Sequence, residues 1–232
     1  MFNKSVKEEL NIELSDAQID QFNKYYDFLI AYNRVTNLTR ITEKEDVFYK
    51  HFYDSMTLVK SIDLNSVQTL CDMGAGAGFP SIPLKIIFPH LKITIIDSLG
   101  KRITFLKQLL ELLSIDNVDL VYDRIENHAQ NHRELYDVVT ARALGKLPLI
   151  LELGMPMIKT NGHFIAYKTS NYEDELFQST DAIKLLGGKL KSITPIKLPD
   201  QYGDRTHIII SKIKKSPSIY PRSFSAIKKK SL

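Results

Sequence analysis

The stretch TLCDMGAGAGFPSIP, residues 69–83, decides how the rest of the sequence is interpreted. Its three glycines, Gly74, Gly76 and Gly78, occupy every second position, after a short apolar run and before a predicted helix. A glycine-rich turn between a strand and a helix lets a nucleotide-like ligand approach the backbone closely. A tight turn without any ligand is the alternative for the glycines taken alone.

Short apolar strands alternate with helical patterns from residue 67 onward. The predicted strands cover residues 67–72, 92–97, 118–123, 136–141, 163–168, 189–197 and 206–213, and helical patterns between them include 100–113 and 171–188. This alternation predicts an α/β fold, a Rossmann-like domain with a doubly wound, mostly parallel sheet of about seven strands. The last two strands are joined by PIKLPDQYGDRT without a helix, which predicts an antiparallel hairpin at one edge.

The chain divides into three predicted regions. Residues 1–62 form an N-terminal helical extension packed on the core, in which Ser15 and Gln18 match a capping box. Residues 63–214 form the Rossmann-like domain, and residues 215–232 form a basic C-terminal tail. From position 205 to the end there are eight Lys and Arg residues and no Asp or Glu, so the rest of a chain with net charge +4 carries −4. This distribution fits a polyanionic partner such as nucleic acid, with a merely solvated tail as the alternative.

Neither a membrane nor a metal ion is expected as a partner. The first residues, MFNKSVKEELNIELSD, are polar, and no apolar segment is long enough to span a bilayer. The single cysteine, Cys71, cannot form an internal disulfide, which favours the reducing cytoplasm. His128 and His132 are four residues apart but lack an H-E-x-x-H pattern, so we expect a surface pair rather than metal ligands.

The glycine loop differs from a dinucleotide fingerprint. The pattern G-x-G-x-x-G would need a glycine where the chain has Phe79, and Asp72 lies two residues before the first glycine. A carboxylate beside the loop is a poor neighbour for a pyrophosphate, but it suits a ligand with an ammonium group and a sulfonium. These observations favour S-adenosylmethionine over NAD as the cofactor.

Two further positions fit the adenosine part of that cofactor. Asp97 ends the second predicted strand, where a carboxylate accepts hydrogen bonds from ribose hydroxyls. Ile125 and Glu126 follow the third strand, where a backbone donor and an apolar side chain can frame adenine.

The motifs together resemble those of a known family, the bacterial small-subunit rRNA guanine-N7 methyltransferases called RsmG or GidB. The resemblance rests on YNRVTNLTRIT, HFYDS, DMGAGAGFPSIPL, DSLGKR, DRIEN, TARAL, AYKTS and YPR, spread over most of the chain. It implies a class I methyltransferase fold, S-adenosylmethionine as cofactor, and 16S rRNA or the small ribosomal subunit as partner. The sequence does not define the oligomeric state, and a monomer is favoured. The implied cofactor contacts are Gly74, Phe79, Asp97, Ser98, Leu99, Ile125, Glu126 and Arg142.

The sequence departs from this family at two places. Ser81 stands where the family usually has glycine, and YPR is followed by SFSAIKKKSL rather than by glycine and proline. The family positions Asn37, Thr39, His51, Asp54 and Ser55 are all present. For these we expect structural roles that join the helices to the sheet.

Methylation of guanine N7 needs no general base, because N7 carries an unprotonated lone pair. No residue is therefore assigned a catalytic role, and we expect in-line transfer that depends on positioning. N7 must be bare during the reaction, so the guanine would be read at its Watson–Crick edge while an aromatic side chain stacks on a splayed-out base. Candidate RNA contacts are Lys101, Arg102, Arg142, Lys168, Arg205 and Arg222.

Other functions are weighed against this interpretation. An NAD-dependent oxidoreductase is disfavoured by Phe79 and Asp72, and a non-catalytic RNA-binding module is disfavoured by the intact glycine loop and Asp97. A methyltransferase that acts on another RNA or on a small molecule stays open, because a cofactor site does not name the acceptor.

Overall fold

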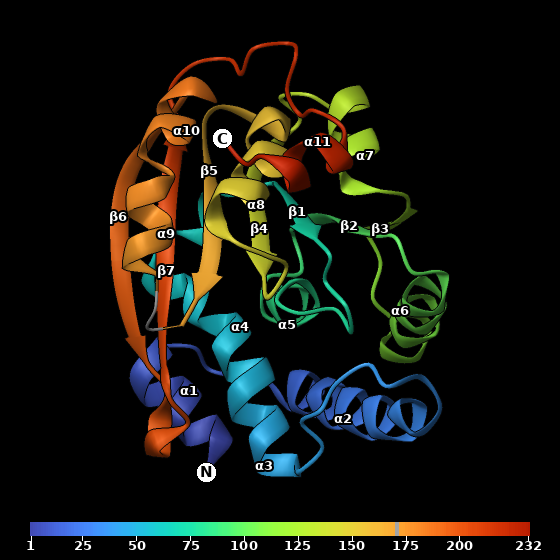
Figure 1. Ribbon diagram of the computed structural model, residues 1–232. Coiled ribbons are helices and arrows are strands. Elements are labelled where there is room, and N and C mark those ends of the chain that lie inside the picture. The colour runs from blue at the N-terminus through green and yellow to red at the C-terminus, as the bar shows by residue number, and fades with distance from the viewer. Residues whose placement is uncertain (170–171) are drawn as a thin grey trace.

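A seven-stranded sheet forms the centre of the computed structural model, which describes residues 1–169 and 172–232 (Figure 1). The strands are β1 (Thr69–Met73), β2 (Lys92–Asp97), β3 (Val118–Tyr122), β4 (Tyr136–Arg142), β5 (Ile158–Lys168), β6 (Gly188–Lys197) and β7 (Asp204–Lys212). Their spatial order is β3-β2-β1-β4-β5-β7-β6. The first five are parallel, whereas β7 runs antiparallel to both β5 and β6. The predicted doubly wound sheet and its edge hairpin are confirmed.

The strand order creates a switch point between β1 and β4. The chain moves outward from β1 to β2 and β3, and then returns to the other side of β1 with β4. In open α/β sheets, ligands bind beyond the carboxyl ends of the strands at such a point. The glycine loop follows β1 directly and therefore lies at this position.

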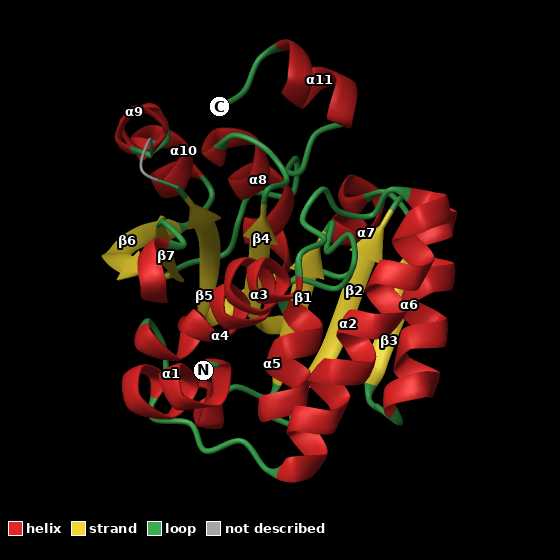
Figure 2. Ribbon diagram, turned by 90° about the horizontal axis from the view of Figure 1, so that it is seen from below, coloured by secondary structure: helices red, strands yellow, loops and turns green. Residues whose placement is uncertain are grey.

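Helices cover both faces of the sheet because successive strand residues point to opposite sides. On one face, Leu70, Ile93 and Ile165 pack with α2 (Asp16–Thr36), α5 (Ser81–Ile87) and α6 (Gly100–Leu113). Figure 2 shows α2 and α6 side by side over β2 and β3, where Phe28 and Phe105 stack with ring centroids 5.3 Å apart. On the other face, Cys71 and Phe164 pack with α7 (Ile125–Asn131) and α8 (Leu147–Gly154).

The N-terminal region is helical and rests on this core at the bottom of Figure 1. The capping box that begins α2 is confirmed, since the Gln18 N–H donates to the Ser15 hydroxyl and the Ser15 N–H donates to the Gln18 amide oxygen. A second helical stretch contains α3 (Lys44–Val47), a π-helical turn over Phe48–Tyr53 and α4 (Asp54–Met56). The sequence did not predict α1 (Phe2–Leu10), which buries Val6 and Leu10 and places Phe2 edge-on against Phe48.

The last residues of the chain fold back onto the helical face that contains α8. Arg222 donates to the buried carboxylate of Glu152, and Tyr220 and Ile227 are buried. The short helix α11 (Phe224–Lys229) lies beside α7 and α8 at the top of Figure 1. The basic C-terminal residues are thus attached to the body of the protein, whereas the three domain boundaries stay predictions.

The helix predicted over 171–188 is interrupted. It forms α9 (Glu173–Gln178) and α10 (Thr180–Leu185), which meet at the buried Ser179. The Ser179 hydroxyl donates to the Glu175 carbonyl oxygen inside the preceding turn. The start of this prediction at Asn171, and the last residue of the AYKTS motif, Ser170, lie outside the described residues. Among the helices described over 1–169 and 172–232, none has the length and apolar character needed to cross a bilayer.

Candidate cofactor site and adjoining cavities

The three glycines of the loop have positive φ angles but different surroundings. Gly74, Gly76 and Gly78 have φ angles of 67°, 63° and 97°. A Cβ atom on Gly78 would lie 2.7 Å from Ile82 and 2.9 Å from the Tyr25 hydroxyl oxygen, so this glycine allows close packing beneath the loop. A Cβ on Gly76 would meet nothing within 4 Å. Gly76 therefore borders open space, where a ligand can approach the backbone.

Asp72 does not face that space. Its side chain is 0% exposed, one oxygen accepts the Ser81 N–H at 3.1 Å, and the other accepts the Thr140 hydroxyl at 3.2 Å. Burial raises the pKa of the Asp72 carboxyl to about 7, against the lowering effect of these hydrogen bonds. The sequence argument set this carboxylate beside the ligand, but its place on β1 points it to the first turn of α5. The geometry supports a role in fixing the loop to α5.

Asp97, at the end of β2, lies at the entrance of the expected adenosine site. One carboxylate oxygen accepts the Leu99 N–H at 2.9 Å. The other accepts the Gly76 N–H at 3.3 Å and an Arg102 guanidinium N–H at 3.1 Å. The carboxylate therefore connects the glycine loop to the start of α6.

A cavity of about 180 Å³ opens beside Asp97. The sequence-predicted residues that line it are Gly74, Asp97, Ser98, Arg102, Ile125 and Glu126. Glu126 accepts a hydrogen bond from Arg124 at 2.7 Å, and this arginine lies over the ring of Phe224, 5.2 Å from its centroid. The neighbouring residue Leu99 is partly exposed and does not line this cavity.

Two larger cavities continue along the same edge of the sheet. One of about 390 Å³ is bounded by Gly76, Phe79 and Arg142, and it shares Gly74, Arg102 and Leu144 with the first. The next, of about 410 Å³, shares His51, Arg142 and Leu144 with the second and reaches Arg205. The three cavities therefore adjoin one another from Asp97 to Arg205.

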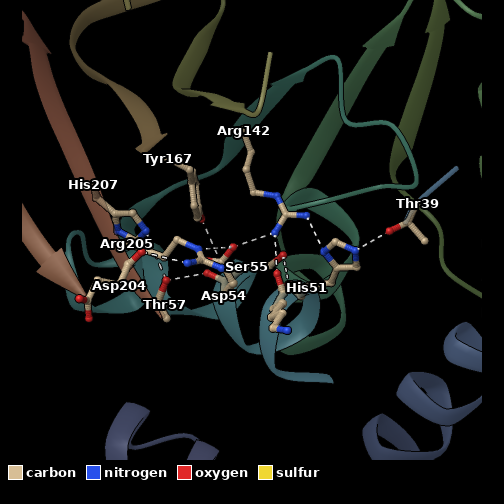
Figure 3. A network of polar contacts seen from close by, with 11 residues as sticks. Thr39, His51, Asp54, Ser55, Thr57, Arg142, Tyr167, Asp204, Arg205 and His207 are labelled. Atoms are coloured by element: carbon tan, nitrogen blue, oxygen red, sulfur yellow. Dashed lines mark hydrogen bonds and ion pairs between the residues drawn. The ribbon is translucent and has the colours of Figure 1, made fainter. Parts of the chain in front are cut away.

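Arg142 stands where the second and third cavities meet, at the end of β4 (Figure 3). Its guanidinium donates to Asp54 at 2.9 Å and to His51 Nδ1 at 3.1 Å, and it lies 5.0 Å above the centre of the Phe79 ring. His51 Nε2 is 2.9 Å from the Thr39 hydroxyl. Because arginine is only a donor, His51 Nδ1 must accept and Nε2–H must donate to Thr39. Burial, followed by the charge of Arg142, lowers the pKa of His51 to about 3, so this imidazole is neutral at physiological pH.

The predicted RNA contacts fall into three groups. Arg142, Lys168 and Arg205 line the third cavity, and Arg102 lines the first two. Lys168 is paired there with Glu175 at 2.6 Å. Lys101 is exposed and donates to the Thr36 carbonyl oxygen, while Arg222 pairs with Glu152 at 2.6 Å; neither lines a cavity at this edge.

Sequence reasoning missed some residues of the site and misplaced one histidine. Leu144 lines all three cavities, and its place in the TARAL motif just after β4 was a usable signal. Phe224 closes the first cavity from the C-terminal end of the chain, and no local pattern indicated this. His128 is 4% exposed and lies 2.9 Å from the Tyr136 hydroxyl, so the expected surface pair is wrong for this residue. Within 1–169 and 172–232, no three His, Cys, Asp or Glu side chains gather as a metal site would require.

Comparisons with known proteins define the class and then the family. The crystal structure of M. jannaschii TYW2 in complex with AdoMet superposes with a TM-score of 0.53 at 17% identity, over 63% of this chain and 70% of that one. The fold is thus that of Rossmann-like methyltransferases.

Sequence relatives are much closer. The model of the GidB family, described as rRNA small subunit methyltransferase G, matches residues 18–205. Ribosomal RNA small subunit methyltransferase G of Bacillus subtilis (strain 168) is 50% identical over 216 residues, 92% of this chain and 90% of the relative. The protein of the same name from Acholeplasma laidlawii (strain PG-8A) is 49% identical over the full length of both chains. The chain belongs to the rRNA small subunit methyltransferase G family.

Proposed function

We propose that this protein transfers a methyl group from S-adenosylmethionine to N7 of a guanosine in 16S rRNA, in line and without a general base. The observation that carries the proposal is the row of adjoining cavities at the switch point, which runs from Asp97 and Glu126 to Arg142 and Arg205. One end suits an adenosine and the other offers cations to an RNA. The names of the relatives supply the substrate class.

The residues of the first cavity fit S-adenosylmethionine. Gly76 borders space that any side chain would partly fill, and the Asp97 carboxylate stands at the end of β2 where ribose hydroxyls are held in this fold. Ile125 and Phe224 offer apolar surface to the adenine. When bound, the cofactor supplies a methyl group on a positively charged sulfur. The chain's part is to hold the adenosine and to leave the side of the cavity at Gly74 open toward Arg142.

The residues at the junction of the cavities are arranged for positioning rather than proton transfer. His51 is neutral and is engaged at both ring nitrogens, by Arg142 and by Thr39. Guanine N7 has no proton to lose, so a site without a free base suits this acceptor. Orientation of the base against the bound cofactor then supplies the rate enhancement.

The partner and the location follow from the substrate. Arg142 and Arg205 line the third cavity, while Lys101 and Arg102 lie at the start of α6, where Arg102 lines the first two cavities. These cations can contact RNA phosphates. Most hydrogen bonds between a protein and a nucleic acid are made to the phosphates and sugars. The protein would act as a monomer in the cytoplasm, on 16S rRNA or on the small subunit.

The decisive experiment incubates the purified protein with labelled S-adenosylmethionine and either naked 16S rRNA or small subunits from cells that lack the gene. Digestion to nucleosides and mass spectrometry should detect N7-methylguanosine in one of the two substrates. Label in another nucleoside, or none in either substrate, would contradict the proposal. Calorimetry should also detect binding of S-adenosylhomocysteine and none of NADH, and the reverse result would favour an oxidoreductase.

A further inference from the structure

Asp54 is a buried carboxylate that joins two arginines in the third cavity. It is 3% exposed, at the start of α4. Its Oδ2 atom accepts from Arg142 at 2.9 Å and lies 3.4 Å from Nε of Arg205 (Figure 3). Arg142 comes from the end of β4 and Arg205 from β7, so three distant parts of the chain meet at one oxygen atom.

The other carboxylate oxygen of Asp54 has no partner. Its Oδ1 is shielded from solvent and accepts no hydrogen bond from any residue within 1–169 or 172–232, and it is the one side-chain polar atom in that part of the chain for which this holds. A buried acceptor without a donor is destabilising, and such atoms are rare in folded proteins. Asp54 also lines the cavity of about 410 Å³. Oδ1 itself is covered, so a donor on a ligand in this cavity reaches it only when a neighbouring side chain moves aside, and the missing hydrogen bond favours that movement.

The chemistry of the four bases identifies that donor. Guanine alone carries two adjacent donors on its Watson–Crick edge, the N1–H and the exocyclic N2 amino group, followed by the O6 acceptor. A carboxylate with a neighbouring guanidinium complements this row of groups. Guanine N7 lies on the opposite side of the purine, so a base read at Asp54 can direct N7 toward the cavity at Gly74.

We propose that Asp54 determines specificity for guanine, its Oδ1 accepting a hydrogen bond from the N2 amino group of the target base. The inference rests on the proposed function and adds to it the residue that reads the acceptor. Arg142 and Arg205 hold the carboxylate in place through Oδ2, which leaves Oδ1 for the base. The structural role expected for Asp54 from the sequence accounts for Oδ2 but leaves Oδ1 unexplained.

The test compares an RNA that contains the mapped target guanosine with the same RNA carrying inosine there. Inosine keeps N1–H, O6 and N7 but lacks the N2 amino group. The wild-type protein should methylate the inosine substrate with kcat/KM lowered roughly 10- to 100-fold, the loss expected when a hydrogen bond to a charged group is removed.

The variant Asp54→Asn should abolish this discrimination. Its amide oxygen would remain with the arginines, which turns the NH₂ group toward the guanine amino group. The guanosine substrate should therefore lose most of its activity, while the inosine substrate loses less. The control Arg205→Gln removes an ion pair to Oδ2, so overall activity should fall. It leaves Oδ1 unchanged, so the preference for guanosine should be kept. Binding of S-adenosylhomocysteine by both variants checks that they fold.

Two outcomes would overturn the inference while leaving the proposed function intact. One is equal wild-type rates on the two RNAs. The other is an Asp54→Asn variant that binds S-adenosylhomocysteine and still prefers guanosine to the wild-type extent, which would make Asp54 purely structural. A wild-type protein that leaves N7 of the guanosine RNA unmethylated would instead contradict the proposed function itself.

Discussion

The residues at one end of the site lie close together in the sequence, whereas those at the other end come from distant parts of the chain. The cavity at Asp97 is made by consecutive strand ends and the loops after them, so apart from Phe224 its residues lie within 74–153. The network around Arg142 joins Thr39, His51 and Asp54 of the N-terminal region to Arg142 and to Arg205, near the start of the last strand, β7. Local loops therefore supply the proposed cofactor end, whereas the proposed acceptor end exists only through tertiary contacts. Substitutions at either end separate these two kinds of construction.

The largest effect is expected for Arg142→Ala, which removes the central cation of the end of the site that is formed by tertiary contacts. Asp54 would lose the shorter of its two ion pairs inside the protein, and removal of one partner of a buried pair costs about 3–5 kcal/mol of unfolding free energy. Methyl transfer should fall roughly 100-fold or more, because the junction of the cavities loses its organising cation. Urea unfolding and a methylation assay measure the two effects.

The matched control is Lys159→Ala, at the half-exposed pair with Asp137. This substitution should lower the unfolding free energy by no more than about 1 kcal/mol. An Arg142 variant no less stable than this control would show that the network does not hold the N-terminal helices to the sheet.

The second effect is a pH dependence of the unfolding free energy, caused by Asp72 at the end of the site that is formed by local loops. Its pKa is raised from 3.8 to about 7, so between these values the folded protein keeps a proton that the unfolded chain has released. The unfolding free energy contributed by Asp72 must then fall as pH rises. Asp72→Asn removes the titration, and its stability relative to wild type should rise by about 2–4 kcal/mol between pH 4 and pH 8.

Urea unfolding at several pH values measures this difference. Asp27→Asn, the same substitution at an exposed position of α2, is the control. A flat difference for Asp72→Asn would mean that this carboxyl titrates as it does in the unfolded chain.

The third effect sharpens the assignment of the cofactor end. Asp97→Ala removes the acceptor expected to hold the ribose, and S-adenosylhomocysteine affinity should fall by about 1–3 kcal/mol. Calorimetry measures the loss, with the exposed Asp119 of β3 replaced by alanine as the control. Unchanged affinity in Asp97→Ala would place the adenosine elsewhere.

The smallest effect is expected for Phe224→Ala. This ring closes the cofactor cavity and carries the Arg124 guanidinium, so its removal should weaken S-adenosylhomocysteine binding by about 1 kcal/mol. The KM for RNA should not change. Phe177→Ala is the control, because that ring is 83% exposed. Identical affinities of the two variants would contradict a role for α11 at the cofactor.

What the sequence predicted follows the same division. Short continuous apolar runs and the glycine loop located every strand, because each signal lies within a few residues of the element that it marks. Asp97, Ile125 and Glu126 were found together for this reason, since strand ends meet at one edge. The helix α1 was missed because Val6 and Leu10 stand among polar residues and become buried only in a core whose other members lie elsewhere along the chain.

The orientation of side chains and the contacts between distant residues could not be predicted from the sequence. The residue type and spacing of Asp72 suggested a ligand contact, yet the alternation of strand faces turns it toward Ser81. Phe224 is distant from the loops that it meets, and nothing local marks it. Arg205 was predicted as an RNA contact, but its ion pair with Asp54 was not. Asp54 was taken as structural, and its orphaned oxygen can be seen only once its neighbours are in place.

The entry of Arg205 from β7 has a consequence for synthesis of the protein. A nascent chain that has emerged only as far as β6 already contains β1 to β5 and the glycine loop, but its Asp54 can meet Arg142 alone. Apart from Phe224, which follows β7, the residues of the cavity proposed for the nucleoside of the cofactor can therefore come together during translation. The proposed acceptor pocket is complete only when the last strand inserts between β5 and β6. Truncated products that end before residue 204 would lack this last strand and so could not complete the acceptor pocket.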